Sequence, residues 1–377
     1  MATPRSVWPG HCLINPLTRT RRGRRNPYRR PYDDPVPGPG PTIADIARAA
    51  EVSTATVSHA LGGTGRVGES TRRRVREVAA ALGYSARRGP RTRTLGLAVT
   101  TYAGSPWNYV EIAYFSRLLT AATAAAHARG YALTLLPADR GAEPLWHDLA
   151  VDGMLLLDSP AGDPVLRALR ARGLPVVFDG RPPDPRPGDV WVDNDHEATT
   201  REVLDHLAAA GATRIALHSA YGREYYTGAV TSAYARWCAE RGMARLVVPF
   251  DPEDGAGHAF DPVFAGPGRP GSDAVYCVYD PGGRQVLAAA ARHGLRIPHD
   301  LLLVCASEDP SYAAGDPPVS TVTLRPEVIG ESAVAALVAL LESPHAAEPG
   351  QLTVPAALTV RTSSRIPPRA APGGPSL

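Results

Sequence analysis

Short polar side chains are concentrated in one segment, STATVSH at residues 53–59. On a helix, hydroxyl and imidazole groups of this kind hydrogen-bond to base edges and to phosphate oxygens. Small Ser, Thr and Ala side chains also keep the helix surface low enough to enter the major groove, which is about 12 Å wide. The candidates for this chemistry are Ser53, Thr54, Ala55, Thr56, Ser58 and His59. The segment therefore favours contact with double-stranded DNA.

Three short helices are predicted around this segment, between Thr42 and Tyr84. Thr42 has the residue type of a helix N-cap, and Asp45 follows where a carboxylate stabilises a helix N-terminus. The second helix is predicted to begin after Ser53 and to end at a pair of glycines, and the third to cover 70–82. Two helices joined by a tight turn, the second short with an exposed polar first half, form a helix-turn-helix.

Positive charge is concentrated at the N-terminal end of the chain. Residues 1–93 contain 18 Arg and 6 acidic residues, whereas the rest contains 22 Arg and 31 acidic residues. This asymmetry suggests a polyanion-binding region joined to an acidic globular body. Residues 1–41 carry seven arginines between Arg19 and Arg30, without an acid among them, and then PVPGPGP. We expect a disordered basic leader there. An arm that holds phosphates and a start codon placed too far upstream remain alternatives.

The segments VSTATVSHAL, GRV, STRRRV and ALGY together resemble the DNA-binding module of the lactose-repressor/galactose-repressor family of bacterial transcription regulators. The resemblance implies that Thr54 and Ala55 read bases. It also implies that the hydroxyl groups of Ser53, Thr56 and Ser58 contact phosphates or cap the helix. The further DNA-contacting residues that we expect are Thr42, Arg66, Thr71, Tyr84, Arg87 and Arg88.

Two residues of the module depart from the family pattern. His59 stands where the family usually has an arginine that reads guanine, and a bidentate Arg–guanine pair is worth about 1–3 kcal/mol of discrimination. One imidazole donates a single hydrogen bond, so we expect altered base preference. Glu51 stands where the family prefers glycine in the turn. If that turn requires positive φ, a non-glycine residue costs roughly 1 kcal/mol.

The join between the module and the next domain, residues 85–94, is shorter than the family hinge. The family continues with a helix that wedges a leucine into the minor groove, whereas here Pro90 interrupts helix formation and no apolar wedge is present. Four arginines remain in the segment, Arg87, Arg88, Arg91 and Arg93. They are expected either to follow the minor groove or to form a flexible linker.

From residue 95 onward, apolar strand-like runs alternate with Ala-rich helical segments. Such alternation predicts an α/β core of parallel sheets covered on both faces, with ligands at the carboxyl ends of the strands. The resemblance implies the family's periplasmic-binding-protein-like core of two parallel-sheet subdomains, for effector binding and dimerisation, over residues 95–366. We expect the first subdomain to comprise about 95–218 and 323–355, and the second about 219–322 and 356–366. Residues 367–377 are expected to be a disordered tail.

The family's effector contacts map onto a scattered set of residues. They come from the first loop, an aromatic at the start of the first helix, acids after later strands and an arginine in R-x-x-G-Y. That arginine is missing, since Val230 takes its place, and Arg223 in the preceding loop is a substitute. The effector-binding residues that we predict are Trp107, Asn108, Tyr114, Phe115, Asp195, Arg223, Asp280 and Glu308.

Enzyme functions are disfavoured because the motifs GxxxxGK[ST], GxSxG and HExxH are absent, as is a GxGxxG that follows a strand. Four scattered cysteines without a CxxC pattern favour reduced thiols rather than a metal site, and we expect no cofactor. No apolar run approaches a membrane span, so a cytoplasmic protein is expected. The sequence predicts a homodimeric transcription regulator, a repressor, modulated by a small molecule such as a sugar. The alternative is a small-molecule-binding protein whose DNA-binding module is vestigial.

Overall fold

The computed structural model divides the chain into two units, residues 1–86 and 87–377, and each is described by itself. Described residues are 42–62, 67–82, 91–100, 109–136, 146, 149–220, 222, 224–265, 271–342 and 350–365. The expected leader at 1–41 and tail at 367–377 lie outside these ranges.

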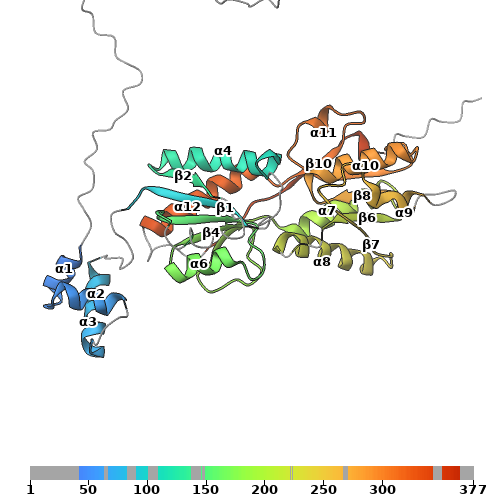
Figure 1. Ribbon diagram of the computed structural model, residues 1–377. Helices are drawn as coiled ribbons and strands as arrows, with labels where there is room; N and C mark the ends of the chain where they lie inside the picture. Colours follow the sequence, from blue (N-terminus) through green and yellow to red (C-terminus); the bar gives the residue numbers. More distant parts are fainter. Residues whose placement is uncertain are drawn as a thin grey trace, which may run out of the picture. The chain divides into compact units, whose positions relative to one another are not determined.

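Within its described residues, the first unit contains three helices, α1 (Ile43–Ala49), α2 (Thr54–Gly62) and α3 (Glu69–Ala81) (Figure 1). Helix α1 begins with the predicted cap. The Thr42 amide donates to Asp45 Oδ2 at 2.8 Å, and the Asp45 amide donates to Thr42 Oγ1 at 3.3 Å. The buried core shared by the three helices consists of Ile46, Ala47, Ala50, Val57, Ala60, Val75 and Ala79. The predicted helix-turn-helix is therefore present, with small and β-branched residues filling its centre.

The turn between α1 and α2 places Glu51 in the left-handed region, at φ 52°. The condition stated for this position, a positive φ, is therefore met in this chain. Glu51 is exposed and keeps its backbone hydrogen bond to Arg48 O at 3.4 Å. The strain of a Cβ in this conformation is therefore present in the folded unit.

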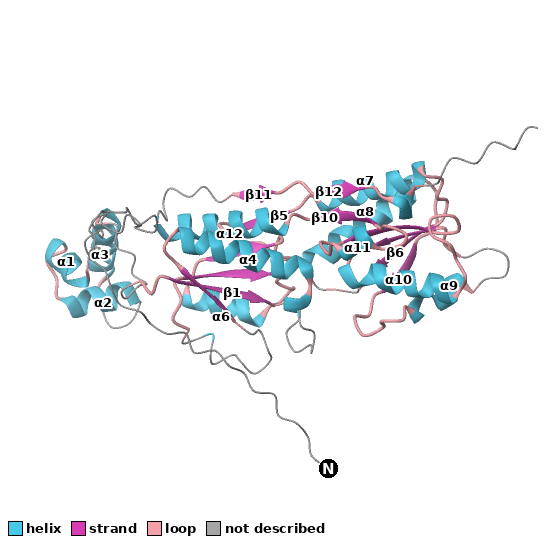
Figure 2. Cartoon of the chain, turned by 90° about the horizontal axis from the view of Figure 1, so that it is seen from above, coloured by secondary structure: helices cyan, strands magenta, loops and turns pink. Residues whose placement is uncertain are grey.

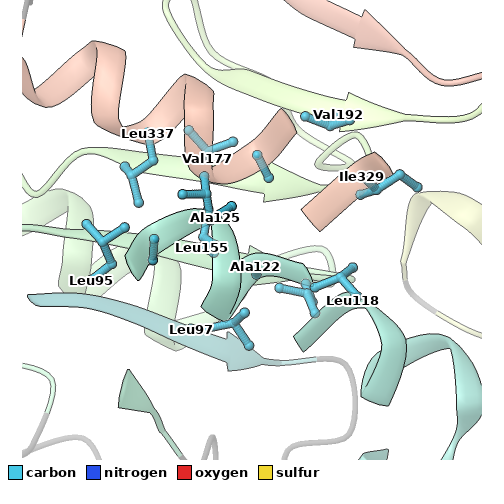
Figure 3. Close-up of a cluster of buried hydrophobic side chains, with 14 of the residues drawn as sticks. Leu95, Leu97, Leu118, Ala122, Ala125, Leu155, Val177, Val192, Ile329 and Leu337 are labelled. Atoms are coloured by element: carbon cyan, nitrogen blue, oxygen red, sulfur yellow. The ribbon is translucent and has the colours of Figure 1, made fainter. Parts of the chain in front are cut away.

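The second unit begins with a six-stranded sheet in the order β11-β5-β4-β3-β1-β2, with every pair parallel. Its strands are β1 (Thr94–Val99), β2 (Ala132–Leu135), β3 (Gly153–Leu157), β4 (Val176–Asp179), β5 (Val190–Asp193) and β11 (Gln351–Thr353). Helices α4 (Ala113–Ala128) and α12 (Pro326–Glu342) cover one face, and α6 (Pro164–Arg172) covers the other (Figure 2). Figure 3 shows Leu118 and Ala122 of α4 beside Leu97 of β1. The central strands β1, β3, β4 and β5 are buried on both faces, which accounts for their largely apolar sequences, whereas the edge strands β2 and β11 are mostly exposed.

A second six-stranded sheet follows, in the order β12-β10-β9-β8-β6-β7, in which only the β10–β12 pair is antiparallel. Its strands are β6 (Ile215–Ser219), β7 (Leu246–Pro249), β8 (Ala274–Cys277), β9 (Leu302–Ala306), β10 (Ser320–Thr323) and β12 (Ala357–Thr359). Helices α7 (His196–Ala209) and α8 (Tyr225–Glu240) cover one face, while α9 (Asp261–Phe264) and α10 (Asp280–Arg292) cover the other. The short helix α11 (Ser311–Ala314) follows β9. The expected core of two parallel-sheet subdomains is confirmed.

The chain passes between the two lobes three times, after β5, after β10 and after β11. Asn194 joins these crossings, because its side-chain amide donates to Leu324 O at 3.1 Å and to Val354 O at 2.7 Å. The first crossing lies beside Asn194, not near residue 218 as we expected, because β6 pairs within the second sheet and α7 packs on it. An apolar strand run does not reveal which sheet it joins.

The residues before β1 are bound to the first lobe. The amides of Thr92 and Arg93 both donate to the buried Asp152 carboxylate at 3.0 Å. Arg91 donates to Leu341 O near the end of α12 at 2.7 Å, and the Arg93 guanidinium lies 5.3 Å from the centre of the Tyr131 ring. These two arginines thus contact the first lobe, although both residues remain exposed. Arg87, Arg88 and Pro90 lie outside the described residues.

Candidate DNA interface and ligand cleft

The polar face of α2 is open to solvent. Thr54, Ala55, Ser58 and His59 are all exposed. They share one side of the helix by its 3.6-residue period, whereas Val57 faces the buried core. A helix can enter the major groove when its exposed face carries short side chains, as this face of α2 does.

Ser53 and Thr56 form hydrogen bonds that cap the N-terminus of α2. The Thr56 amide donates to Ser53 Oγ at 3.0 Å, and the two hydroxyl groups are hydrogen-bonded at 2.8 Å. Of the other predicted DNA contacts, Thr42 is exposed and belongs to the α1 cap, and Thr71 is half-buried on α3. Arg66, Tyr84, Arg87 and Arg88 lie outside the described residues.

A cavity opens between the carboxyl ends of the two sheets and contains about 730 Å³, counting its open mouth. Parallel sheets place ligand sites at this edge. Side chains from both lobes line it: Ile112, Tyr114, Phe115, Asp158, Asp179, Gly180, Asp193, Asn194, His196, Tyr226, Val278, Tyr279, Asp280, Pro281, Ala306, Ser307, Glu308 and Leu324.

Four predicted effector residues line this cavity: Tyr114, Phe115, Asp280 and Glu308. Asp195 does not line it. The Asp195 carboxylate accepts from the Ala198 amide at 2.9 Å and caps α7. The remaining predictions, Trp107, Asn108 and Arg223, lie outside the described residues. Val230, at the family's arginine position, is buried in the core of the second lobe.

Two aspartates stand at the first-lobe side of the cavity. Tyr114 donates its hydroxyl to the Asp179 carboxylate, at 2.9 and 3.0 Å from its two oxygens. Burial raises the pKa of Asp179 to about 7, the Tyr114 hydrogen bond opposes the rise, and Asp193 adds to it. Asp158 has φ 49°, and burial together with the Asp179 charge raises its pKa well above the usual range of an aspartate. Burial therefore favours the protonated form of each carboxyl group, and Asp179 loses its proton at about pH 7.

The acids on the second-lobe side are neutralised by neighbours. Arg117 donates to Glu308 Oε2 at 3.0 Å and to Glu327 Oε1 at 2.5 Å. Glu308 also accepts from the Thr323 hydroxyl and the Leu324 amide, the latter at 2.7 Å. Since Arg117 belongs to α4 and Glu308 follows β9, this ion pair joins the two lobes beside the cavity.

Asp280 and Asp193 also have partners. Ser307 donates its hydroxyl to Asp280, whose carboxylate lies 3.7 Å from the Arg284 guanidinium. Asp193 Oδ1 lies 2.7 Å from His196 Nε2. Both aspartates are therefore held by protein groups on the cavity wall.

The sequence analysis missed Asp158, Asp179 and Asp193, although each has the same signal. Each aspartate closes an apolar run, in GMLLLD, PVVFD and DVWVD. The rule that ligands bind at the carboxyl ends of parallel strands identifies all three. We followed the family's acid position to Asp195 instead.

Comparison with known proteins agrees with both halves of this arrangement. Residues 42–86 match the model for bacterial regulatory proteins of the lacI family, and residues 204–364 match a periplasmic binding protein-like domain. The chain belongs to the lacI family. Among the described helices of this lacI-family protein, none is long and apolar enough to cross a membrane.

The family protein has curated relatives along most of its length. It is 27% identical over 312 residues to the HTH-type transcriptional repressor PurR of Mannheimia succiniciproducens, which covers 78% of this chain and 90% of that protein. It is 27% identical over 353 residues to the HTH-type transcriptional regulator CelR of Thermobifida fusca, covering 86% of this chain and 98% of the relative. These relatives are regulators of transcription, and this chain is a DNA-binding transcription regulator of the same family.

Solved structures share the fold. A CelR–cellobiose complex has 24% sequence identity and a TM-score of 0.63, over 86% of this chain and 99% of that one. The lac repressor dimer bound to operator and the anti-inducer ONPF has 20% identity and a TM-score of 0.61, over 87% and 100%. The likeness supports the two-lobed core described above.

Proposed function

We propose that this protein represses transcription as a homodimer that binds a near-palindromic operator through α2 of each subunit. A small molecule in the cavity between the lobes changes its affinity for that operator. The observation that carries the proposal is one chain with both an exposed, hydroxyl-rich α2 and a cavity of ligand size. Because its target is chromosomal DNA, we place the protein in the cytoplasm.

Base contacts are assigned to the exposed face of α2. Thr54 and Ala55 stand at the beginning of the helix, where a recognition helix reaches base edges, and Ser58 and His59 follow one turn later. Ser53, Thr71 and the exposed guanidinium groups of Arg73 and Arg74 are suited to phosphate oxygens, which position the unit without reading sequence.

Coupling between the two sites follows from thermodynamics. If a ligand lowers operator affinity by a given factor, operator binding lowers ligand affinity by the same factor. The three chain connections between the lobes, which Asn194 joins by hydrogen bonds, allow the lobes to close or open around the cavity.

A mobility-shift assay on the DNA that flanks the protein's own gene tests the proposal. Binding is expected to weaken steeply as salt rises, because phosphate contacts release counterions. Binding that is absent at low salt, or that is indifferent to salt, contradicts the proposal and leaves the alternative of a ligand-binding protein with a vestigial module.

His59→Arg tests the base-reading face with the same protein. Selection of bound sequences from a random pool is expected to yield a different preferred base at one position of each half-site, because arginine makes a bidentate pair with guanine. Arg74→Ala on α3 is the matched control, expected to weaken binding without changing the preferred motif. An unchanged motif in His59→Arg shows that this position does not read bases.

A further inference from the structure

We propose that the small molecule bound in the cavity carries a protonated amine, held by the carboxylates of Asp158 and Asp179. This inference rests on the proposed function, since it specifies the ligand of the cavity through which operator binding is controlled.

The first observation is the charge of the described cavity wall. Five carboxylic acids line it, namely Asp158, Asp179, Asp193, Asp280 and Glu308. His196 is the one basic side chain among the described lining residues. A ligand that carries a carboxylate or a phosphate would meet repulsion on this wall, whereas a cation is attracted to it.

The second observation is that three of the five acids already have protein partners, whereas Asp158 and Asp179 can still bind a ligand. Arg117 neutralises Glu308, His196 is bonded to Asp193, and Asp280 has Ser307 and the more distant Arg284. Within the described ranges, Asp179 receives only the neutral hydroxyl of Tyr114, and the Asp158 carboxyl has no hydrogen-bond donor.

The positions of the two available acids fit a shared partner. They follow neighbouring parallel strands, and the Asp158 amide donates to Asp179 O at 3.1 Å. A Cβ added at Gly180 would lie 3.7 Å from Asp158 Oδ1, so the Asp158 carboxyl lies directly over the backbone that follows Asp179. An ammonium group has three donors and no acceptor, which matches two adjacent carboxylates.

The third observation is the aromatic content of the same cavity. Tyr114, Phe115, Tyr226 and Tyr279 line it, and the His196 ring lies 4.8 Å from the Tyr226 ring, centre to centre. Aromatic faces attract cations, and they also receive the apolar body of an organic amine. The wall thus offers an anionic pair for the ammonium group and rings for the remainder of the ligand.

The raised pKa values of the pair supply a signature for this binding mode. Asp158 and Asp179 must lose protons to bind an ammonium group, so affinity is expected to rise as the pH rises through about 7, the pKa of Asp179. For one proton released, the gain approaches about tenfold per pH unit. Asp193 and Glu224 also face the pair, and His196, Asp280 and Glu308 lie on the remaining wall.

The experiment uses the full chain and matched pairs of probes that differ in one group: benzylamine against benzyl alcohol, and glucosamine against glucose. Thermal shift and titration calorimetry are expected to detect the amine of each pair at concentrations where its neutral partner does not bind. Benzylamine affinity is expected to rise between pH 5.5 and 7. A neutral partner that binds as tightly as its amine, amines that do not bind, or a flat pH profile overturns the proposal.

Asp158→Asn and Asp179→Asn test the residues themselves. Asparagine keeps the shape and tolerates the positive φ of position 158, so both variants are expected to fold. Each is expected to lose at least about tenfold in amine affinity and to flatten the pH profile. Asp184→Asn, on an exposed loop outside the cavity, is the control and is expected to bind like the parent. Unchanged binding by both cavity variants contradicts the assignment.

The same probes separate this inference from the proposed function. If a neutral sugar binds the cavity and alters operator affinity, the proposed function is supported and the inference of an amine ligand is refuted. An amine that binds through Asp158 but leaves operator affinity unchanged supports the amine and refutes the regulation.

Discussion

Replacing Glu51 by glycine is expected to stabilise the helix-turn-helix unit. Glu51 has φ 52° in the turn between α1 and α2, and its side chain is exposed. A left-handed backbone costs a residue with a Cβ about 1–2 kcal/mol. Glycine removes that cost but adds freedom to the unfolded chain, which returns about 0.4–1 kcal/mol. The net gain in the free energy of unfolding of this unit is therefore about 0.5–1 kcal/mol.

Hydrogen exchange measures this gain in the full chain without requiring the larger core to unfold. The amides of Ala50 and Val57 donate within the unit, to Ile46 O at 2.7 Å and Ser53 O at 3.0 Å. Their exchange is expected to slow by about two- to fivefold in Glu51→Gly. Glu51→Ala is the control, because it removes the carboxylate and keeps the strained Cβ. Equal protection in both variants, or none in either, would refute the attribution to backbone strain.

Three further outcomes test the core. Asp152→Ala removes the acceptor of the Thr92 and Arg93 amides, and is expected to lower the free energy of unfolding by about 1–3 kcal/mol. Hydrogen exchange at these two amides is expected to become faster. Unchanged exchange contradicts the role given to the Asp152 carboxylate. Gly330→Ala brings a Cβ to 2.7 Å from Leu118 O where α12 crosses α4, and is expected to cost about 1–3 kcal/mol in urea unfolding. Gly228→Ala, at an exposed position of α8 with nothing within 4 Å, is the control and is expected to be neutral or stabilising. Asp179 has a folded pKa of about 7 against 3.8 in the unfolded chain, so its neutral form stabilises the fold fully below pH 4 and this contribution is lost as pH rises through 7. The urea unfolding midpoint is therefore expected to fall less between pH 5 and 8 in Asp179→Asn than in the parent protein. If the midpoints of the two proteins change with pH in parallel, the raised pKa of Asp179 is contradicted.

Local signals in the sequence predicted the first unit well. The α1 cap at Thr42 and Asp45 and the α2 cap at Ser53 both depend on neighbours within four residues. Such features depend on backbone chemistry at one place in the chain, so residue type and spacing are enough to find them. The alternation of strands and helices in the core was predicted for the same reason.

Features that join distant parts of the chain were predicted poorly. The first lobe crossing was placed near 218 because the pairing of β6 with β7 and β8 is set by packing, which periodicity does not show. Arg91 and Arg93 have the composition of a solvated linker, yet their partners, Leu341 and Tyr131, lie far away in the sequence. Asp195 carried the family's acid signal, but helix capping uses its carboxylate, and Asp193 reaches the cavity from the strand end.

Helix α12 connects the cavity to the segment that precedes the core. At its beginning, Glu327 shares Arg117 with Glu308 of the opposite lobe. Near its end, the carbonyl of Leu341 accepts from Arg91. The helix packs on α4 over its length, where Gly330 leaves no room for a side chain against Leu118. We propose that a ligand that changes the separation of the lobes alters the Arg117 bridge, and so acts on the helix whose Leu341 carbonyl accepts from Arg91.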